Sequence, residues 1–533
     1  MKDMLLDNLL IIIVLLLAVS LLSMLSDKLR ISYPIFLVLS GLIIGFIPNV
    51  LDITLEPNLV FLIFLPPLLY VAAWNTSWKD FWAFRRAINL LAFGLVIFTS
   101  CAVAVVSHWI IPGFSLAIGF LLGGIISPPD AIAATSVLQK LAMPKRVVTI
   151  LEGESLVNDA SSLIVFRFAL AAVLTGKFVL WEAGLDFVVV VAVGVLIGLA
   201  IAFVIYAIHR FLPTTSSVDT AITLIAPYLM YITAEHFNCS GVLAVVSGGL
   251  FLSSQSTKIF SYSSRLQAQS VWETLVFLLN GAVFILIGLQ LPVIMNSLDA
   301  GTITKGVFYG VVISLLTIVV RILWVFTGTY LPRMVSKKIR KNEPYSSWKS
   351  VFIVAWSGMR GVVSLAAALS IPLTLSTGEA FPYRNLILFI SFIVILVTLV
   401  LQGLTLPYLI RKLNIEEKSN EREHLLEVQI KLTSAVIDHI NKEYAHEAET
   451  IHAFRQLKDR HEHLLEAQKK QLTKKDGTPS YAPAYRKALL ELIEVRRKAL
   501  EEMQKDGKYP DELMRNIERE IDHEEARLRV QTK

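Results

Sequence analysis

The sequence predicts an all-α integral membrane protein with a charged helical tail, and three observations lead to this fold class. The 533 residues are 55% hydrophobic and 17% charged, with a mean hydropathy of +0.62, whereas a soluble protein is about 45 to 50% apolar and about 25% charged. Residues 411–533 carry 25 basic and 25 acidic residues, and the first 410 carry only 24 and 18. Long apolar stretches recur throughout that first part. We therefore expect a transmembrane domain, residues 1–412, and a cytoplasmic helical tail, residues 413–533.

About thirteen segments are candidates for crossing a bilayer, since one helical crossing needs about 20 apolar residues. In chain order they cover residues 4–25, 33–51, 58–74, 88–111, 114–140, 148–174, 184–209, 218–237, 239–254, 271–295, 306–331, 350–373 and 385–410. Lysine and arginine gather in alternate loops between these segments, as at Arg85, Arg86, Lys145 and Arg146. Because basic loops stay in the cytoplasm, the alternation predicts an external N-terminus and a cytoplasmic tail in a multi-pass protein of the cell (plasma) membrane.

Two of these segments contain residues that interrupt a helix. The fifth includes residues 127–130 (Ser-Pro-Pro-Asp), and the twelfth includes residues 357–361 (Ser-Gly-Met-Arg-Gly). Proline removes a backbone donor, and glycine readily adopts unwound conformations. Interrupted segments at matching positions of two halves are typical of transporters with inverted repeats and a site near the midplane. We expect an inverted-repeat fold with these two broken helices crossed.

The sixth segment begins with polar residues that are costly inside a membrane. One Asp at a helix centre costs roughly 2.5 to 3.5 kcal/mol on insertion scales. In a helix, Ser155, Asp159 and Ser162 share one face, and Glu154 and Asn158 share the neighbouring face. Their oxygens suit a small alkali or alkaline-earth cation. Asp159 and Asn158 are therefore candidate cation ligands, and an Asp that holds either a cation or a proton would couple the two.

Several functional classes are not supported by the sequence. It has no nucleotide-binding loop, His/Cys metal cluster or nucleophile motif. We therefore expect that the protein is not an enzyme, needs no cofactor and carries out transport driven by ion gradients alone. The excess basic residues lie in short loops, where they act as topology signals and not as a nucleic-acid surface. Cys101 and Cys239 have no framework spacing, which argues against a disulfide and a metal site.

Other charged residues in the apolar region have simpler interpretations. Glu152 and Asp219 lie near segment ends, where we expect them to be solvated. Arg167 and Arg321 are expected to serve in packing or as counter-charges. Asp159 could itself be a structural carboxylate neutralised by an arginine, which is the alternative to an ion-binding role.

The sequence of the tail, by contrast, predicts soluble amphipathic helices. Residues 421–473 have apolar positions at helical spacing among mixed charges, which predicts one long helix. Breaks are expected at 476–479 and 506–510, with further helices over 484–505 and 511–530. Seven of the ten histidines lie in this tail. A solvated or dimerising tail is the simpler interpretation, a histidine-based pH sensor is the alternative, and its partner is unknown.

Four blocks of the apolar region are specific enough to compare with a known family. They are SPPDAIAATSVLQKL at 127–141, EGESLVNDASSLIVF at 152–166, FLLNGAVFILIGLQLP at 277–292 and GMRGVVSLAAALSIP at 358–372. Together they resemble the monovalent cation:proton antiporter-1 family, which includes bacterial sodium/proton antiporters and animal sodium/proton exchangers. The resemblance covers roughly residues 5–412. It implies a homodimer, with a dimerisation bundle and a core that moves in an elevator-like cycle.

The resemblance also implies roles for individual residues. In the family the Asn-Asp pair is the ion site, and this pair falls on Asn158 and Asp159. Ser155 is implied as a further ligand, and Glu154 is implied to pair with Arg360.

One position of the broken fifth helix departs from the family pattern. Asp130 matches the family's Asp and is expected to have a structural and electrostatic role. Pro129 replaces the family's Thr, so it can supply only a backbone carbonyl as a possible ligand. This change affects one cation ligand and bears on ion selectivity.

The resulting hypothesis is sodium/proton antiport for pH and sodium homeostasis, with Na⁺ or Li⁺ and H⁺ competing for one carboxylate. Members of the family with Asn-Asp are generally electroneutral, since Asn158 adds a ligand without a second titratable charge. The nearest alternative is a potassium/proton or broad monovalent cation/proton antiporter. A cation channel and a transporter-derived sensor are more distant alternatives.

Overall fold

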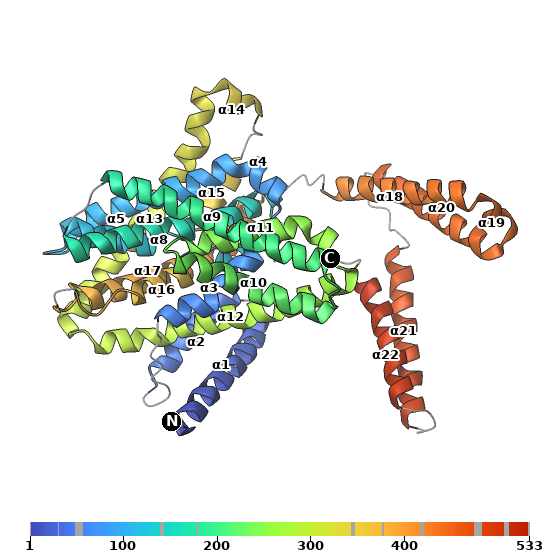
Figure 1. The fold of residues 1–533 in the computed structure, drawn as a ribbon, viewed down its shortest axis with the longest axis horizontal. Helices are drawn as coiled ribbons and strands as arrows, with labels where there is room; N and C mark the ends of the chain where they lie inside the picture. The colour runs from blue at the N-terminus through green and yellow to red at the C-terminus, as the bar shows by residue number, and fades with distance from the viewer. Residues whose placement is uncertain are drawn as a thin grey trace. The chain divides into compact units, whose positions relative to one another are not determined.

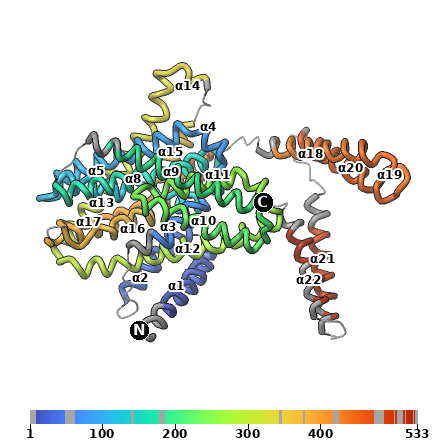
Figure 2. The backbone as a smooth tube through the Cα atoms, in the orientation of Figure 1, coloured from blue at the N-terminus to red at the C-terminus, as the bar shows by residue number. Residues whose placement is uncertain are grey.

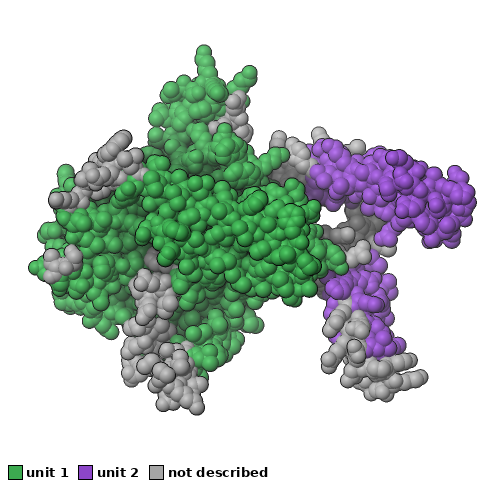
Figure 3. Space-filling model, in the orientation of Figure 1, with its two compact units in different colours: residues 1–417 green, residues 418–533 purple. Residues whose placement is uncertain are grey.

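The computed structural model describes residues 2–29, 31–47, 57–138, 143–176, 180–342, 347–375, 378–415, 421–473, 482–505 and 511–530. Within these ranges the chain is helical apart from short turns and one isolated β-bridge, between Thr374 and Ala380. It divides into two compact units, residues 1–417 and residues 418–533 (Figure 3). The sequence analysis placed the corresponding boundary between residues 412 and 413.

The first unit is a bundle of long apolar helices (Figures 1 and 2). Its helices are α1 (Lys2–Leu29), α2 (Tyr33–Gly45), α3 (Pro57–Asn75), α4 (Trp78–Asn89), the π-helix η1 (Leu90–Leu95), α5 (Val96–Ile110), α6 (Leu116–Ile126), α7 (Ala131–Leu138), α8 (Lys145–Thr175), α9 (Leu180–Phe211), α10 (Ser216–His236), α11 (Gly241–Ile259), α12 (Tyr262–Asn296), α13 (Ala300–Val335), α14 (Lys337–Asn342), α15 (Trp348–Trp356), α16 (Val362–Leu369) and α17 (Arg384–Leu413). Among the described residues, nine helical stretches are long and apolar enough to cross a membrane, and two shorter apolar helices accompany them. The all-α membrane fold is confirmed.

Both predicted helix interruptions are present. Residues 127–130 separate α6 from α7, and residues 357–361 separate α15 from α16. The first interruption follows from the two prolines at 128 and 129, which have no N–H to continue the hydrogen-bond ladder. The interruptions also meet, because the Asp130 N–H donates to the Met359 carbonyl at 2.7 Å. The ends of two expected segments, residues 48–51 and 139–140, lie outside the described residues.

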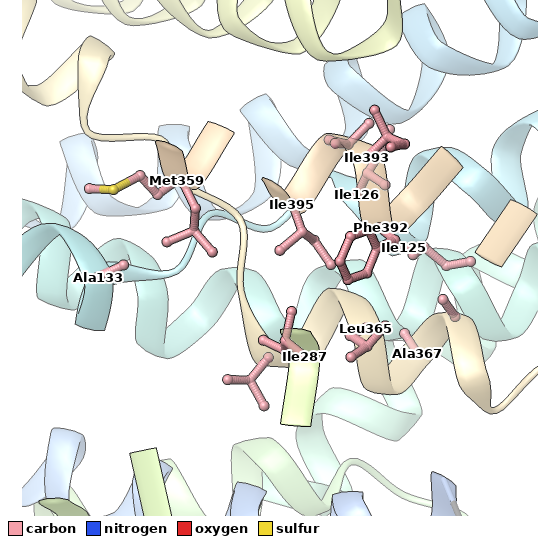
Figure 4. Close-up of a cluster of buried hydrophobic side chains, with 14 of the residues drawn as sticks. Ile125, Ile126, Ala133, Ile287, Met359, Leu365, Ala367, Phe392, Ile393 and Ile395 are labelled. Atoms are coloured by element: carbon pink, nitrogen blue, oxygen red, sulfur yellow. The ribbon is translucent and has the colours of Figure 1, made fainter. Parts of the chain in front are cut away.

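A buried apolar cluster surrounds this meeting point (Figure 4). Ile125 and Ile126 come from α6, Leu365 comes from α16, and Phe392 and Ile395 come from α17; each is less than 5% exposed. Water has little access to such a region, so the polar backbone groups freed by the broken helices need partners within the protein.

The second unit consists of α18 (Glu421–Glu443), α19 (Ala445–Thr450), α20 (His452–Thr473), α21 (Ala482–Lys505) and α22 (Asp511–Val530). The prediction of one helix over 421–473 is wrong, because the chain leaves the helix at Tyr444 and Ile451 and α20 packs back on α18. Folding back buries Leu426, Ile437 and Ile440, which a single helix would expose along one stripe. The predicted breaks at 476–479 and 506–510 lie outside the described residues.

Candidate ion-binding site

Helix α8 carries the Asn158–Asp159 pair in a buried position. Asn158 is fully buried and Asp159 is 7% exposed. The Asn158 Nδ2 atom donates to the Pro129 carbonyl at 3.0 Å, while its Oδ1 atom is buried and has no hydrogen-bond partner among the described residues. An unpaired buried carbonyl oxygen is unfavourable, so this oxygen is a suitable ligand for a cation.

The unwound segment between α6 and α7 lies directly against this pair. The Ala131 N–H donates to Ser155 Oγ on α8 at 3.4 Å. The Asp130 Oδ1 atom accepts from the Ile132 N–H at 2.8 Å, which satisfies a donor at the start of α7. The structure therefore brings Ser155, Asn158 and the Pro129 backbone together, as the family resemblance implied.

Asp159 lines a cavity of about 300 Å³. Its lining includes Asp130, Ser155, Pro129 and Glu152. In the part of the chain that the structure describes, no hydrogen bond or ion pair to the Asp159 carboxylate is found, whereas Asp130 is held by α7. The two aspartates of this cavity therefore differ, because the Asp130 carboxylate is held by a backbone hydrogen bond and, within the described residues, the Asp159 carboxylate is not.

A second cavity of about 540 Å³ continues from the first. The two share Tyr33, Asn75 and Asn280 in their linings, and the second also reaches Arg265 and Glu273 near the start of α12. The shared lining, which also includes Val71 and Val276, connects the N-terminal part of α12 with the cavity at Asp159. Asn280 lies within one of the four family-like blocks, although the sequence analysis gave it no individual role.

The implied pairing of Glu154 with Arg360 is wrong. Glu154 instead forms a bidentate ion pair with Arg321 of α13, with Oε1–Nη1 and Oε2–Nη2 distances of 2.5 and 2.8 Å. Both side chains are 1% exposed. Arg321 Nη2 also donates to the Val354 carbonyl at 3.1 Å. Arg321 is therefore the counter-charge of Glu154. Which of the two buried arginines takes this role depends on where the fold places α13 relative to α8.

Arg360 instead links the two broken helices. Its Nη1 atom donates to the Ser127 carbonyl at the end of α6, and its N–H donates to Thr398 Oγ1 at 3.1 Å. A cation at the C-terminal end of a helix is favourable, as is a carboxylate at an N-terminal end. Arg360 at α6 and Asp130 at α7 thus complement the two half-helices at the crossing.

Of the two carboxylates near segment ends, Asp219 contradicts the expectation that it is solvated. Asp219 is 3% exposed, and its two oxygens contact His209 Nδ1 at 2.8 Å and Ser264 Oγ at 2.7 Å. It is therefore buried where α9, α10 and α12 meet, and not solvated. Glu152 is partly exposed but faces the same cavity as Asp159. Glu152 and Asp159 are seven residues apart, a spacing that places both on one helix face. This spacing could have predicted from the sequence that Glu152 lies near Asp159.

Comparison with known proteins decides the family. Residues 12–412 match the family described as "Sodium/hydrogen exchanger, transmembrane". The chain belongs to the sodium/hydrogen exchanger family. This confirms the resemblance drawn from the four sequence blocks, and the matched range agrees with the predicted extent of the transmembrane domain.

Relatives of this chain come from several bacteria. The chain is 36% identical over 388 residues to a "Sodium, potassium, lithium and rubidium/H(+) antiporter" of Bacillus pumilus. The matched residues are 71% of this chain and 58% of that protein, so this chain spans little more than half of that relative's length. It is 31% identical over 449 residues to an uncharacterized Na(+)/H(+) exchanger of Mycobacterium tuberculosis, covering 82% of this chain and 80% of that one. It is 33% identical over 394 residues to the "Low-affinity Na(+)/H(+) antiporter NhaS1" of Synechocystis, covering 72% and 70%.

Solved structures support the fold of this chain. The sodium proton antiporter MjNhaP1 of Methanocaldococcus jannaschii aligns with a TM-score of 0.61 at 19% sequence identity, over 77% of this chain and 100% of that chain. At this identity the similarity concerns the fold alone. The predicted antiporter fold with two broken helices is thereby confirmed.

Proposed function

We propose that this chain is a secondary active antiporter that exchanges Na⁺ or Li⁺ for H⁺ at Asp159. The observation that carries the proposal is Asp159, which lines a cavity together with Ser155 and Pro129 and lacks a carboxylate hydrogen bond or ion pair among the described residues. Asn158, the preceding residue, has a buried Oδ1 without a hydrogen-bond partner among the described residues and donates to the Pro129 carbonyl. These are hard oxygen ligands of the kind that small cations prefer. A proton and a cation would compete for the same carboxylate, and this competition makes the exchange obligatory.

The proposed exchange is electroneutral. Glu154 and Arg321 neutralise one another, and Asp130 is engaged by the start of α7. Asn158 offers an oxygen but no second titratable group. One carboxylate would then carry one sodium ion in one direction and one proton in the other, so that the membrane potential would not drive the cycle.

Alternating access would bring Asp159 to each side of the membrane in turn. The connected cavities extend past Asn280 and Glu273 to Arg265, beside the basic loop expected in the cytoplasm, so we assign this conformation to the inward-facing state. Movement of the helices that carry Asp159 across the membrane is favoured when a proton or a cation neutralises the carboxylate. The further proposals are a homodimer in the cell membrane, an external N-terminus, a cytoplasmic tail and a role in pH homeostasis. No cofactor is required for this cycle.

A broad monovalent cation/proton antiporter is the second candidate. The Bacillus relative is named for sodium, potassium, lithium and rubidium. Pro129 also removes a side-chain hydroxyl from the site, and fewer fixed ligands reduce discrimination by cavity size.

The test is proton movement in vesicles that contain the purified full-length protein and a preset pH gradient. Adding NaCl or LiCl should alkalinise an acidic interior at the same rate with the potential clamped or free, whereas Asp159→Asn should be folded and inactive. The apparent KM for sodium should rise as the pH falls, up to about tenfold per pH unit, because proton and cation binding are reciprocally linked.

The vesicle assay also separates the alternatives. An equal response to KCl would assign the broad exchanger. Exchange retained by Asp159→Asn would refute the proposed site. Sodium flux without any proton movement would refute antiport.

A further inference from the structure

A cavity separate from the ion site lies between the ends of four helices. It measures about 280 Å³, is lined by parts of α4, η1, α8, α13 and α15, and shares no described lining residue with the cavity at Asp159. Arg86 in the last turn of α4, Arg146 in the first turn of α8 and Arg333 in the last turn of α13 line it. No Asp or Glu is found among its described lining residues. The cavity therefore gathers three positive charges.

Two helix N-termini add to this positive potential. Helix α8 begins at Lys145 after Pro144, and α15 begins at Trp348 after its N-cap Ser347, and neither first turn holds an acidic residue. Pro144 and Ser347 both line the cavity. Ser347 Oγ already accepts from the Ser350 N–H in α15, but the other first-turn amides of both helices lack intrahelical partners, and the helix dipole favours an anion there. Asp80 lies 3.9 Å from Lys145 in the first turn of α8 but does not line the cavity.

The remaining wall of the cavity is apolar. It is formed by Leu90, Leu91, Val325, Val351 and Val354. Helix α4, which supplies Arg86, also exposes Trp78 and Trp82, and tryptophan at this exposure is typical of the membrane–water interface. A ligand that combines a phosphate with an apolar part fits this lining better than a small anion does.

We propose that this cavity binds the phosphate group of an anionic phospholipid through Arg86, Arg146 and Arg333. Guanidinium groups match phosphate geometry by forming two parallel hydrogen bonds, and basic pockets between transmembrane helices bind lipid head groups. The three arginines also interact within the protein, so a phosphate would join or replace those contacts. The acyl chains would remain in the bilayer. Inorganic phosphate shares the recognised chemistry, and the test distinguishes the two sources.

The experiment measures thermal unfolding of the purified full-length protein in detergent while one additive is titrated. The additives are phosphatidylglycerol, phosphatidylcholine with the same acyl chains, and inorganic phosphate. Phosphatidylglycerol should raise the midpoint temperature of the wild type, and phosphatidylcholine should not. Arg146→Gln and Arg333→Gln should each raise the half-saturating phosphatidylglycerol concentration about tenfold, as expected for one lost charge-assisted contact.

Matched variants keep the proposal falsifiable. Arg85→Gln removes the neighbouring charge on α4, which does not line the cavity, and should leave the titration unchanged. Arg146→Lys keeps the charge and should weaken binding less than Arg146→Gln, which separates binding from misfolding.

Three outcomes would overturn the lipid proposal. The first is an equal response to phosphatidylglycerol and phosphatidylcholine. The second is a wild-type titration in folded Arg146→Gln and Arg333→Gln. The third is full stabilisation by inorganic phosphate alone, lost in the same variants, which would reassign the cavity to a soluble anion.

Discussion

The buried pair of Glu154 and Arg321 makes a sharp prediction about stability. Both side chains are 1% exposed and are joined by two hydrogen bonds of 2.5 and 2.8 Å. Replacing one partner leaves an uncompensated buried charge, which costs about 3–5 kcal/mol. Removing both charges with apolar residues of similar volume is often close to neutral. Glu154→Leu and Arg321→Met should therefore each destabilise strongly, and the double variant should recover most of the loss.

A double-mutant cycle measures this coupling. Equilibrium unfolding of the purified protein in lipid–detergent micelles would give the free energy of the wild type, both single variants and the double variant. We expect a coupling energy of at least about 2 kcal/mol between positions 154 and 321.

The matched control is the same cycle between Glu154→Leu and Arg360→Met. Arg360 donates to the Ser127 carbonyl and not to Glu154, so its coupling should be smaller. If the 154/360 cycle gave the larger coupling, or if the 154/321 effects were additive, the pairing derived from the structure would be refuted.

Three further predictions concern other contacts of the membrane domain. Gly361→Ala should destabilise by about 1–3 kcal/mol and lower transport, because a Cβ at this position would collide with the Asp130 carboxylate; thermal unfolding and vesicle exchange measure both effects. Asn158→Asp should make any remaining exchange sensitive to the membrane potential, since the site would gain a second carboxylate; exchange with the potential clamped and free tests this. His209→Ala should destabilise by about 1–3 kcal/mol, because Asp219 would lose a buried partner at 2.8 Å; equilibrium unfolding measures the change.

Each of these predictions has a contrasting result. Gly184→Ala, where a Cβ would meet nothing within 4 Å, is the control for Gly361→Ala, and an equal loss in both would contradict the collision. If exchange by Asn158→Asp did not depend on the membrane potential, the proposal that a second carboxylate adds a transported charge would be contradicted. An unchanged free energy of unfolding in His209→Ala would mean that Asp219 is satisfied without His209.

Much of the candidate ion site could be predicted from the sequence because its determinants are local. The i, i+4 spacing on one helix places Ser155 and Asp159 on the same face before any packing is known. The prolines at 128 and 129 interrupt their own helix through the loss of N–H donors. Family-like blocks then indicate that these elements occur together, and the Pro129 carbonyl does lie within hydrogen-bond distance of Asn158.

The missed features all depend on contacts between segments far apart in the chain. The sequence contains several intramembrane arginines, and which one neutralises Glu154 depends on where the fold places α13 relative to α8. Asp219 lies near a helix end, and its burial depends on α9 and α12 closing over it. The fold-back of α20 on α18 has the same origin, because amphipathic periodicity does not specify which helix covers the apolar face.

The sequence by itself determined the membrane body, the charged tail, the two interrupted helices and the Asn158–Asp159 pair, because hydropathy, proline and glycine chemistry and helical spacing act over a few residues. Only the tertiary structure decided the partners of the buried charges, the cavity that reaches Asp159 and the basic cavity at Arg146. Those features arise where distant helices pack, and a buried charge is stable only beside the group that packing places next to it.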